Sequence, residues 1–161
     1  MTRGPLLFLD IDGVLIPFGG RDHRTYPPPP AEAAGPLLAR ADPALGVQLL
    51  DLGCELVWAT TWGAEANATV APRLGLPPLA VLDEPEHDGP PGLHWKTRPI
   101  LAHAAGQPFV WVDDEIGAAD RRWVAAHHPG PALLHAVDPV RGLCAQDLAA
   151  IRSAILTWPP R

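Results

Sequence analysis

Two pairs of acidic residues in this sequence have the types and spacing to hold a metal ion. The first pair is Asp10 and Asp12, the second is Asp113 and Asp114, and an apolar run precedes each pair. Four carboxylates gathered at one place would repel one another strongly if all were charged and unpaired. A divalent cation would relieve that repulsion, and Mg²⁺ suits such hard oxygen ligands because it keeps waters and accepts phosphate oxygens. The acids therefore predict a magnesium site that can receive a phosphorylated substrate.

The elements that must position these acids follow from the apolar pattern of the chain. Short continuous apolar runs are typical of strands buried in a parallel sheet, and longer amphipathic stretches of helices. We expect strands at 6–9, 55–59, 79–82, 109–112 and 132–136, and helices at 44–52, 63–74, 95–105, 118–128 and 145–158. This alternation predicts a doubly wound, Rossmann-like α/β fold with a parallel sheet of about five strands. The length of 161 residues fits a single domain, 1–161.

The polar residues at the ends of these strands are expected to meet at one edge of the sheet. In open α/β sheets, ligands bind beyond the carboxyl ends of the strands. Asp10 and Asp12 project to the same side, because side chains along a strand alternate between its two faces. Thr60 and Thr61 end the second strand and should lie at the same edge.

Charge, composition and missing motifs exclude several other functions. The formal net charge of −6 argues against a general nucleic-acid coat, which needs a basic face. The sequence has no GxG dinucleotide fingerprint and no phosphate-binding P-loop, and its only serine, Ser153, lacks a nucleophile elbow. The apolar start is interrupted at Asp10, and no run reaches the ~18 apolar residues of a membrane span. We therefore expect a cytoplasmic protein without a membrane partner.

The polar residues occur in an order that resembles the haloacid dehalogenase (HAD) superfamily of phosphohydrolases. The first motif is an apolar strand followed by Asp10-Ile11-Asp12-Gly13, and the second is a strand that ends in Thr60. The third is an isolated lysine, here Lys96, which is the only lysine of the chain. The fourth is an acidic pair after a strand, Asp113-Asp114. The four motifs span residues 5–120.

The resemblance implies a catalytic role for each motif. Asp10 would be the nucleophile that forms an aspartyl-phosphate, and Asp12 would protonate the leaving oxygen and then activate water. Thr60 would hydrogen-bond a phosphoryl oxygen, with Thr61 as the alternative if the register differs by one residue. Lys96 would neutralise charge between the nucleophile and the phosphate.

The resemblance also implies how magnesium is held. Asp10, the main-chain carbonyl of Asp12 and the carboxylate of Asp114 would bind Mg²⁺, with Asp113 alongside. Many members carry a further acid four or five residues after the second acid of the fourth motif. This sequence has two alanines there and then Asp120.

Members of this superfamily commonly carry a cap domain, and this sequence has no room for one. The segments 14–43 and 75–94 are short and rich in Pro and Gly, so the closest likeness is to small capless domains, including those associated with RNA repair proteins. The loop Phe18–Pro30 is a candidate cover for the site. Its Arg21 and Arg24 are suited to binding a substrate phosphate, and the alternative is a solvated loop with incidental charges.

The expected function is therefore Mg²⁺-dependent hydrolysis of a phosphomonoester, with a phosphorylated small molecule as the first candidate substrate. Two alternatives stay open: a phosphatase that acts on nucleic-acid ends or another macromolecule, and a degenerate domain that only binds a phosphorylated ligand. Trp62 and Trp95 stand next to the polar positions, where they could either wall the site or pack in the core.

Overall fold

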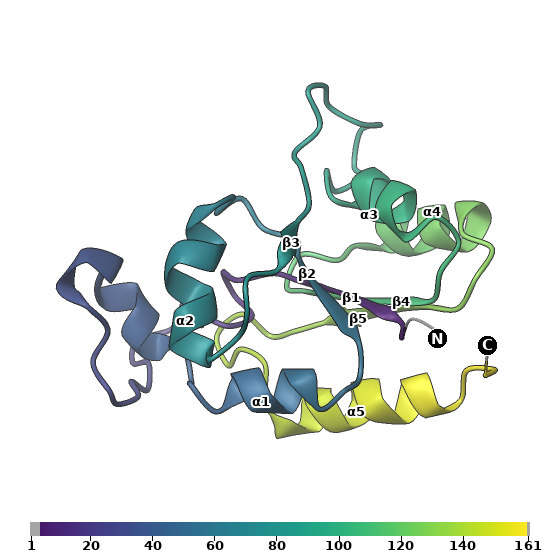
Figure 1. Cartoon of the computed structure of the whole chain (residues 1–161). Helices are drawn as coiled ribbons and strands as arrows, with labels where there is room; N and C mark the ends of the chain where they lie inside the picture. The colour runs from purple at the N-terminus through teal and green to yellow at the C-terminus, as the bar shows by residue number, and fades with distance from the viewer. Residues whose placement is uncertain (1–3, 161) are drawn as a thin grey trace.

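The computed structural model describes residues 4–160 and shows a parallel sheet covered by helices on both faces (Figure 1). The five strands lie in the order β3-β2-β1-β4-β5, and every neighbouring pair is parallel. They are β1 (Leu6–Leu9), β2 (Glu55–Trp58), β3 (Ala80–Val81), β4 (Phe109–Asp113) and β5 (Ala132–Ala136). The α/β fold with a parallel sheet of five strands is confirmed.

The helices form one layer on each side of this sheet. They are α1 (Leu45–Leu50), α2 (Ala71–Leu74), α3 (Thr97–Ala104), α4 (Ala118–His127) and α5 (Ala145–Leu156), and a π-helical stretch, η3 (Ala66–Val70), runs into α2. Helices α3 and α4 cover one face, and α1, α2 and α5 cover the other (Figure 1). None of the helices within residues 4–160 has the length and apolar character needed to cross a membrane.

The apolar run of β1 is continuous because both faces of the sheet are buried. Leu7 and Leu9 belong to the core on the side of α1 and α5, whereas Leu6 and Phe8 belong to the core beneath α3 and α4. All four side chains are at most 2% exposed. A strand buried on both faces loses the polar alternation of a half-exposed strand, which is why its sequence is apolar throughout.

The segments after β1 and β2 contain no folded cap. Between residues 14 and 43 the regular structure consists of two short 3₁₀ helices, η1 (Glu32–Ala34) and η2 (Pro36–Arg40). Gly35 separates them with a φ of 80°, and Pro36 then begins η2, whose Leu38 is buried. Residues 75–94 hold only β3 and a loop. The described chain is therefore a capless domain.

The strand order places two acidic positions next to each other. The chain moves outward from β1 through β2 to β3 and then returns to the other side of β1 to form β4. At such a switch point the connections leave in opposite directions, which opens a crevice at the carboxyl ends of the strands. Asp10 follows β1 directly, Asp113 ends β4, and the Asp10 N–H donates to the Val112 carbonyl at 3.2 Å.

A buried carboxylate ties α5 to the edge strand β5. Asp147 accepts hydrogen bonds from the Cys144 N–H and from His135 Nε2, both at 2.9 Å, and Arg141 lies 3.3 Å away. Burial raises the pKa of Asp147, but the bonds from His135 and Cys144 outweigh that effect and hold it below its ordinary value. The charged form of Asp147 therefore stabilises the folded state.

We expect Asp147→Asn to lower the free energy of unfolding at neutral pH by about 1.5–3 kcal/mol, the range for hydrogen bonds to charged groups. A depressed pKa makes this contribution fully present above the unfolded value of 3.8 and removes it as the pH falls through the folded pKa. Urea unfolding at neutral and strongly acidic pH measures the difference, which should shrink in acid. The exposed Asp138→Asn is the control. A difference that persists unchanged in strong acid would contradict the role of the charge.

Candidate active site

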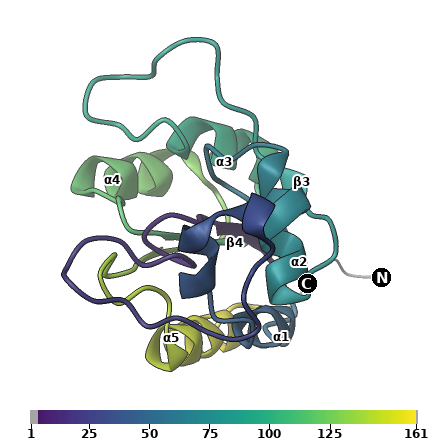
Figure 2. The ribbon, with the colours of Figure 1, turned by 90° about the vertical axis from the view of Figure 1, so that its left-hand side faces the viewer.

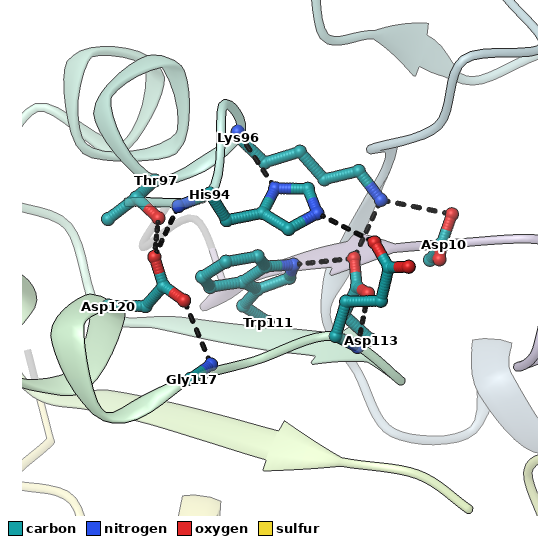
Figure 3. Close-up of polar contacts among 9 residues, drawn as sticks. Asp10, His94, Lys96, Thr97, Trp111, Asp113, Gly117 and Asp120 are labelled. Atoms are coloured by element: carbon teal, nitrogen blue, oxygen red, sulfur yellow. Dashed lines mark hydrogen bonds and ion pairs between the residues drawn. The ribbon is translucent and has the colours of Figure 1, made fainter. Parts of the chain in front are cut away.

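The ammonium of Lys96 bridges two carboxylates at the carboxyl ends of β1 and β4. Its Nζ lies 3.0 Å from Oδ1 of Asp10 and 2.6 Å from Oδ2 of Asp113 (Figure 3). Lys96 is 4% exposed, and it stands directly before the first residue of α3. The structure thus brings the third motif of the sequence together with the first and the fourth.

Asp113 is a fixed anion whose two oxygens are both engaged. Oδ2 accepts from Lys96 Nζ and, at 3.2 Å, from Trp111 Nε1, and Oδ1 accepts from the Glu115 N–H at 3.0 Å. Burial works against ionisation of this fully buried carboxyl, but Lys96 beside it holds its pKa below the ordinary value. Asp113 therefore serves mainly to hold Lys96.

Asp10 shares the same ammonium but has less compensation for its charge. Burial raises the pKa of Asp10 to about 8; Lys96 opposes this rise and the neighbouring Asp113 adds to it. The pKa of Asp114 is also raised, first by burial and then by Asp113. The Lys96 ammonium is paired with two of these three carboxyl groups, Asp10 and Asp113, so this cluster holds more carboxyl groups than its one cation can pair with.

The same three carboxyl groups form a cluster that suits a hard divalent cation. One oxygen from each of Asp10, Asp113 and Asp114 lies within 4.8 Å of the others. The main chain of Gly13 packs against Asp114, because a Cβ at Gly13 would stand 2.5 Å from Oδ2 of Asp114. An all-oxygen donor set with uncompensated charge fits Mg²⁺. Since both oxygens of Asp113 already accept hydrogen bonds, Asp10 and Asp114 are the better candidates for direct ligands.

The carboxylate of Asp12 lies apart from this cluster and is held by an indole. Trp62 Nε1 donates to Oδ2 of Asp12 at 3.0 Å, and the half-buried Trp62 ring also packs against the core. Trp62 therefore packs against the core and contacts Asp12, but it is not among the residues that line the cavity at this edge of the sheet. Asp12 is free of the ion pairs that engage Lys96, which suits a group that exchanges protons.

The two threonines after β2 take different positions. Thr60 is 2% exposed, and its hydroxyl oxygen accepts from the Trp62 N–H at 3.3 Å. Thr61 is exposed and lines a cavity of about 190 Å³. The other residues that line this cavity are Asp10, Asp12, His94, Trp95, Lys96, Asp114 and Glu115. Thr61 is thus the threonine that lines the cavity, whereas Thr60 is not among its lining residues.

The structure does not bring Arg21 and Arg24 into this cavity. No residue of Phe18–Pro30 lines it, and both arginines are exposed, with the Arg24 guanidinium 4.8 Å from the centre of the Tyr26 ring. The segment after β1 lies instead beside the loop between β5 and α5 (Figure 2), where the Phe18 N–H donates to the Pro139 carbonyl. A contact between these arginines and a larger substrate stays a prediction.

His94 and Glu115 also line the cavity, although their sequence context gives little indication of a role there. His94 Nδ1 accepts from the Lys96 N–H at 3.2 Å, so the ring proton lies on Nε2, which faces Glu115 at 3.3 Å. The edge of this ring meets Trp111 with centroids 5.8 Å apart. The position of His94 two residues before Lys96 is the one signal that could have pointed to this histidine.

Asp120 contacts the residues on either side of Lys96 and is not part of the cluster of Asp10, Asp113 and Asp114. Its Oδ1 accepts from the His94 N–H at 2.9 Å and from Thr97 Oγ1 at 2.6 Å, and its Oδ2 accepts from the Gly117 N–H at 2.9 Å (Figure 3). These bonds join the start of α4 to the segment that carries Lys96. The late acid of the fourth motif is therefore a positioning residue.

A capless α/β domain with Asp-x-Asp-Gly after its first strand, a buried lysine and an acidic pair at the end of β4 has the architecture of a HAD domain. Residues 6–148 match the family described as the HAD domain in Swiss Army Knife RNA repair proteins, and the chain belongs to this family. Comparison with curated proteins and with solved structures gave no match.

The packing of Gly13 against Asp114 generates a prediction about metal binding. We expect Gly13→Ala to weaken Mg²⁺ binding by about tenfold or more, the usual cost of disturbing the support of a metal ligand, because the new methyl group displaces Asp114. Gly35→Ala is the matched control, since Gly35 has a similar φ of 80° but nothing within 4 Å of the place where its new methyl group would stand. Titration calorimetry measures both affinities, and equal losses in the two variants would contradict this account.

Proposed function

We propose that this domain is a Mg²⁺-dependent phosphomonoesterase that works through an aspartyl-phosphate on Asp10. The observation that carries the proposal is the buried Lys96 ammonium between Asp10 and Asp113, at the floor of an open cavity of about 190 Å³. A buried cation beside a nucleophilic carboxylate is what phosphoryl transfer needs, because negative charge must be stabilised as the phosphoryl group approaches.

In the first step, a carboxylate oxygen of Asp10 attacks phosphorus, and the bond from phosphorus to the leaving oxygen breaks. Asp12 gives its proton to that oxygen, so the product leaves as an alcohol. Lys96 holds Asp10 in place through Oδ1 and faces the incoming phosphoryl oxygens with its positive charge. Thr61, which lines the cavity, donates a hydrogen bond from its hydroxyl to one of these oxygens.

In the second step, Asp12 removes a proton from water, and the water oxygen attacks the phosphorus of the acyl phosphate. The bond between phosphorus and Asp10 breaks, which releases inorganic phosphate and restores the carboxylate. The Trp62 indole keeps Asp12 oriented toward the cavity in both steps. When bound near Asp10 and Asp114, Mg²⁺ would supply positive charge to the phosphoryl oxygens.

The phosphorylated end of a nucleic acid is a second candidate substrate, besides a phosphorylated small molecule. The family match favours it, because the matching family is described from RNA repair proteins. The open site supports it too, since no cap within the described residues limits the size of the substrate.

Asp10→Asn tests the proposed function. The amide has the same shape but is a poor nucleophile, so we expect turnover of an aryl phosphate to be lost while the circular dichroism spectrum is retained. Chelation of divalent cations should also abolish turnover, and added Mg²⁺ should restore it.

The exposed acid Asp83 provides the matched control, and Asp83→Asn should keep full activity. Residual activity of Asp10→Asn within tenfold of the wild type would contradict the nucleophilic role. A wild-type protein that binds phosphorylated ligands but never hydrolyses them would support the degenerate binding domain instead.

The proton role of Asp12 predicts a dependence on the leaving group. We expect Asp12→Asn to lose more activity toward alkyl phosphates than toward aryl phosphates, because a good leaving group needs little protonation. A series of phosphomonoesters with graded leaving-group pKa values measures this difference. Equal losses along the series would assign Asp12 a structural role only.

A further inference from the structure

We propose that a groove next to the catalytic cavity binds the nucleobase of a nucleotide phosphomonoester. This inference rests on the proposed phosphatase function and adds the identity of the group that carries the phosphate. The groove has a volume of about 690 Å³ and lies between α3 and the loop before it. That loop follows β3 and rises above α3 (Figure 1).

The groove is continuous with the catalytic cavity through two shared residues. His94 and Trp95 line both the groove and the cavity, and they directly precede Lys96 in the chain. The Lys96 ammonium lies 5.8 Å from the centre of the Trp95 ring. A substrate whose phosphate faces Lys96 would thus extend its leaving group across Trp95 and into the groove.

The walls of the groove suit a flat, uncharged ring. Trp95, His94 and His87 contribute aromatic rings to its lining, and Pro85, Leu93 and Pro99 contribute apolar side chains. The volume falls within the range of about 300–1,000 Å³ that is usual for small-ligand sites. Stacking of a base on an aromatic side chain contributes about 1–3 kcal/mol and tolerates any base.

The charged side chains around the groove favour a nucleobase over a phosphate chain as its occupant. Glu86 and Asp88 stand on its loop wall, and Arg98 lines it from α3. Two carboxylates would repel a polyphosphate or a sugar-phosphate backbone laid along the groove. The same carboxylates can accept hydrogen bonds from the exocyclic amines of bases.

His94, which lines both the groove and the cavity, is held in place by contacts within the protein. Asp120 accepts from the main chain of His94, and the His94 ring contacts Lys96, Glu115 and Trp111. A wall fixed in this way loses little conformational freedom on binding, which favours affinity.

The experiment compares kcat/KM for adenosine 3′- and 5′-monophosphate with kcat/KM for ribose 5-phosphate, which lacks the base. We expect the better nucleotide to exceed the sugar phosphate by about tenfold or more in the wild type, as stacking predicts. The double variant His87→Ala, Arg98→Ala should reduce this ratio to about twofold. Arg122→Ala, which removes an exposed arginine from α4, is the matched control and should keep the wild-type ratio.

The same comparison identifies the source of the nucleotide and the results that would overturn the proposal. Higher turnover of a short oligonucleotide with a terminal phosphate identifies a nucleic-acid end, whereas higher turnover of the mononucleotide identifies a free nucleotide. A ratio near one in the wild type, an unchanged ratio in the double variant, or a phosphopeptide preferred over every nucleotide would overturn the groove as a base site.

A binding measurement keeps the groove testable if the proposed function fails. If none of these substrates is hydrolysed, the phosphatase function is wrong, but the groove can still be probed with adenosine alone. Saturation-transfer NMR should detect adenosine on the wild-type protein and lose the signal in the double variant. Absence of the signal from the wild type would overturn the base site.

Discussion

The ion pair of Lys96 with Asp10 and Asp113 is the interaction on which the rest of the site depends. An ammonium that is 4% exposed has lost most of its hydration, and only well-placed anions can compensate for that loss. Asp113 does so at 2.6 Å and is itself held by Trp111 and by the main chain of Glu115. Removing one partner of such a buried pair typically costs about 3–5 kcal/mol, so this arrangement constrains the fold as well as the chemistry.

The supports of this ion pair come from elements far apart in the sequence. Parallel strands β1 and β4 place Asp10 and Asp113 side by side at the switch point of the sheet. Asp120, from the first turn of α4, fixes the segment before α3 and so sets where Lys96 enters. The cavity that contains Lys96 and the groove proposed to bind a base thus share one scaffold, because His94 lines both.

Much of the fold and of the candidate site could be predicted from the sequence, because the patterns that indicate them involve residues close together in the chain. Buried parallel strands are apolar throughout, so the run before Asp10 indicated both the strand and the edge where it ends. The partners that orient the site could not be predicted, because they depend on tertiary packing: Trp62 reaches Asp12 across 50 positions of the chain, and Asp120 reaches Thr97 across 23. The choice between Thr60 and Thr61 depends on where β2 ends, which a pattern fixes only to within a residue or two.

The most direct test of the central claim is to look for a phosphoryl group attached to the protein. Protein mixed with a phosphomonoester and Mg²⁺ is quenched in acid, which preserves acyl phosphates, and its peptides are then mapped by mass spectrometry. This account predicts a phosphoryl group on the peptide that contains Asp10, at Asp10 itself, and none in Asp10→Asn. A phosphoryl group on another residue, or hydrolysis with no phosphorylated peptide at any quench time, would contradict it.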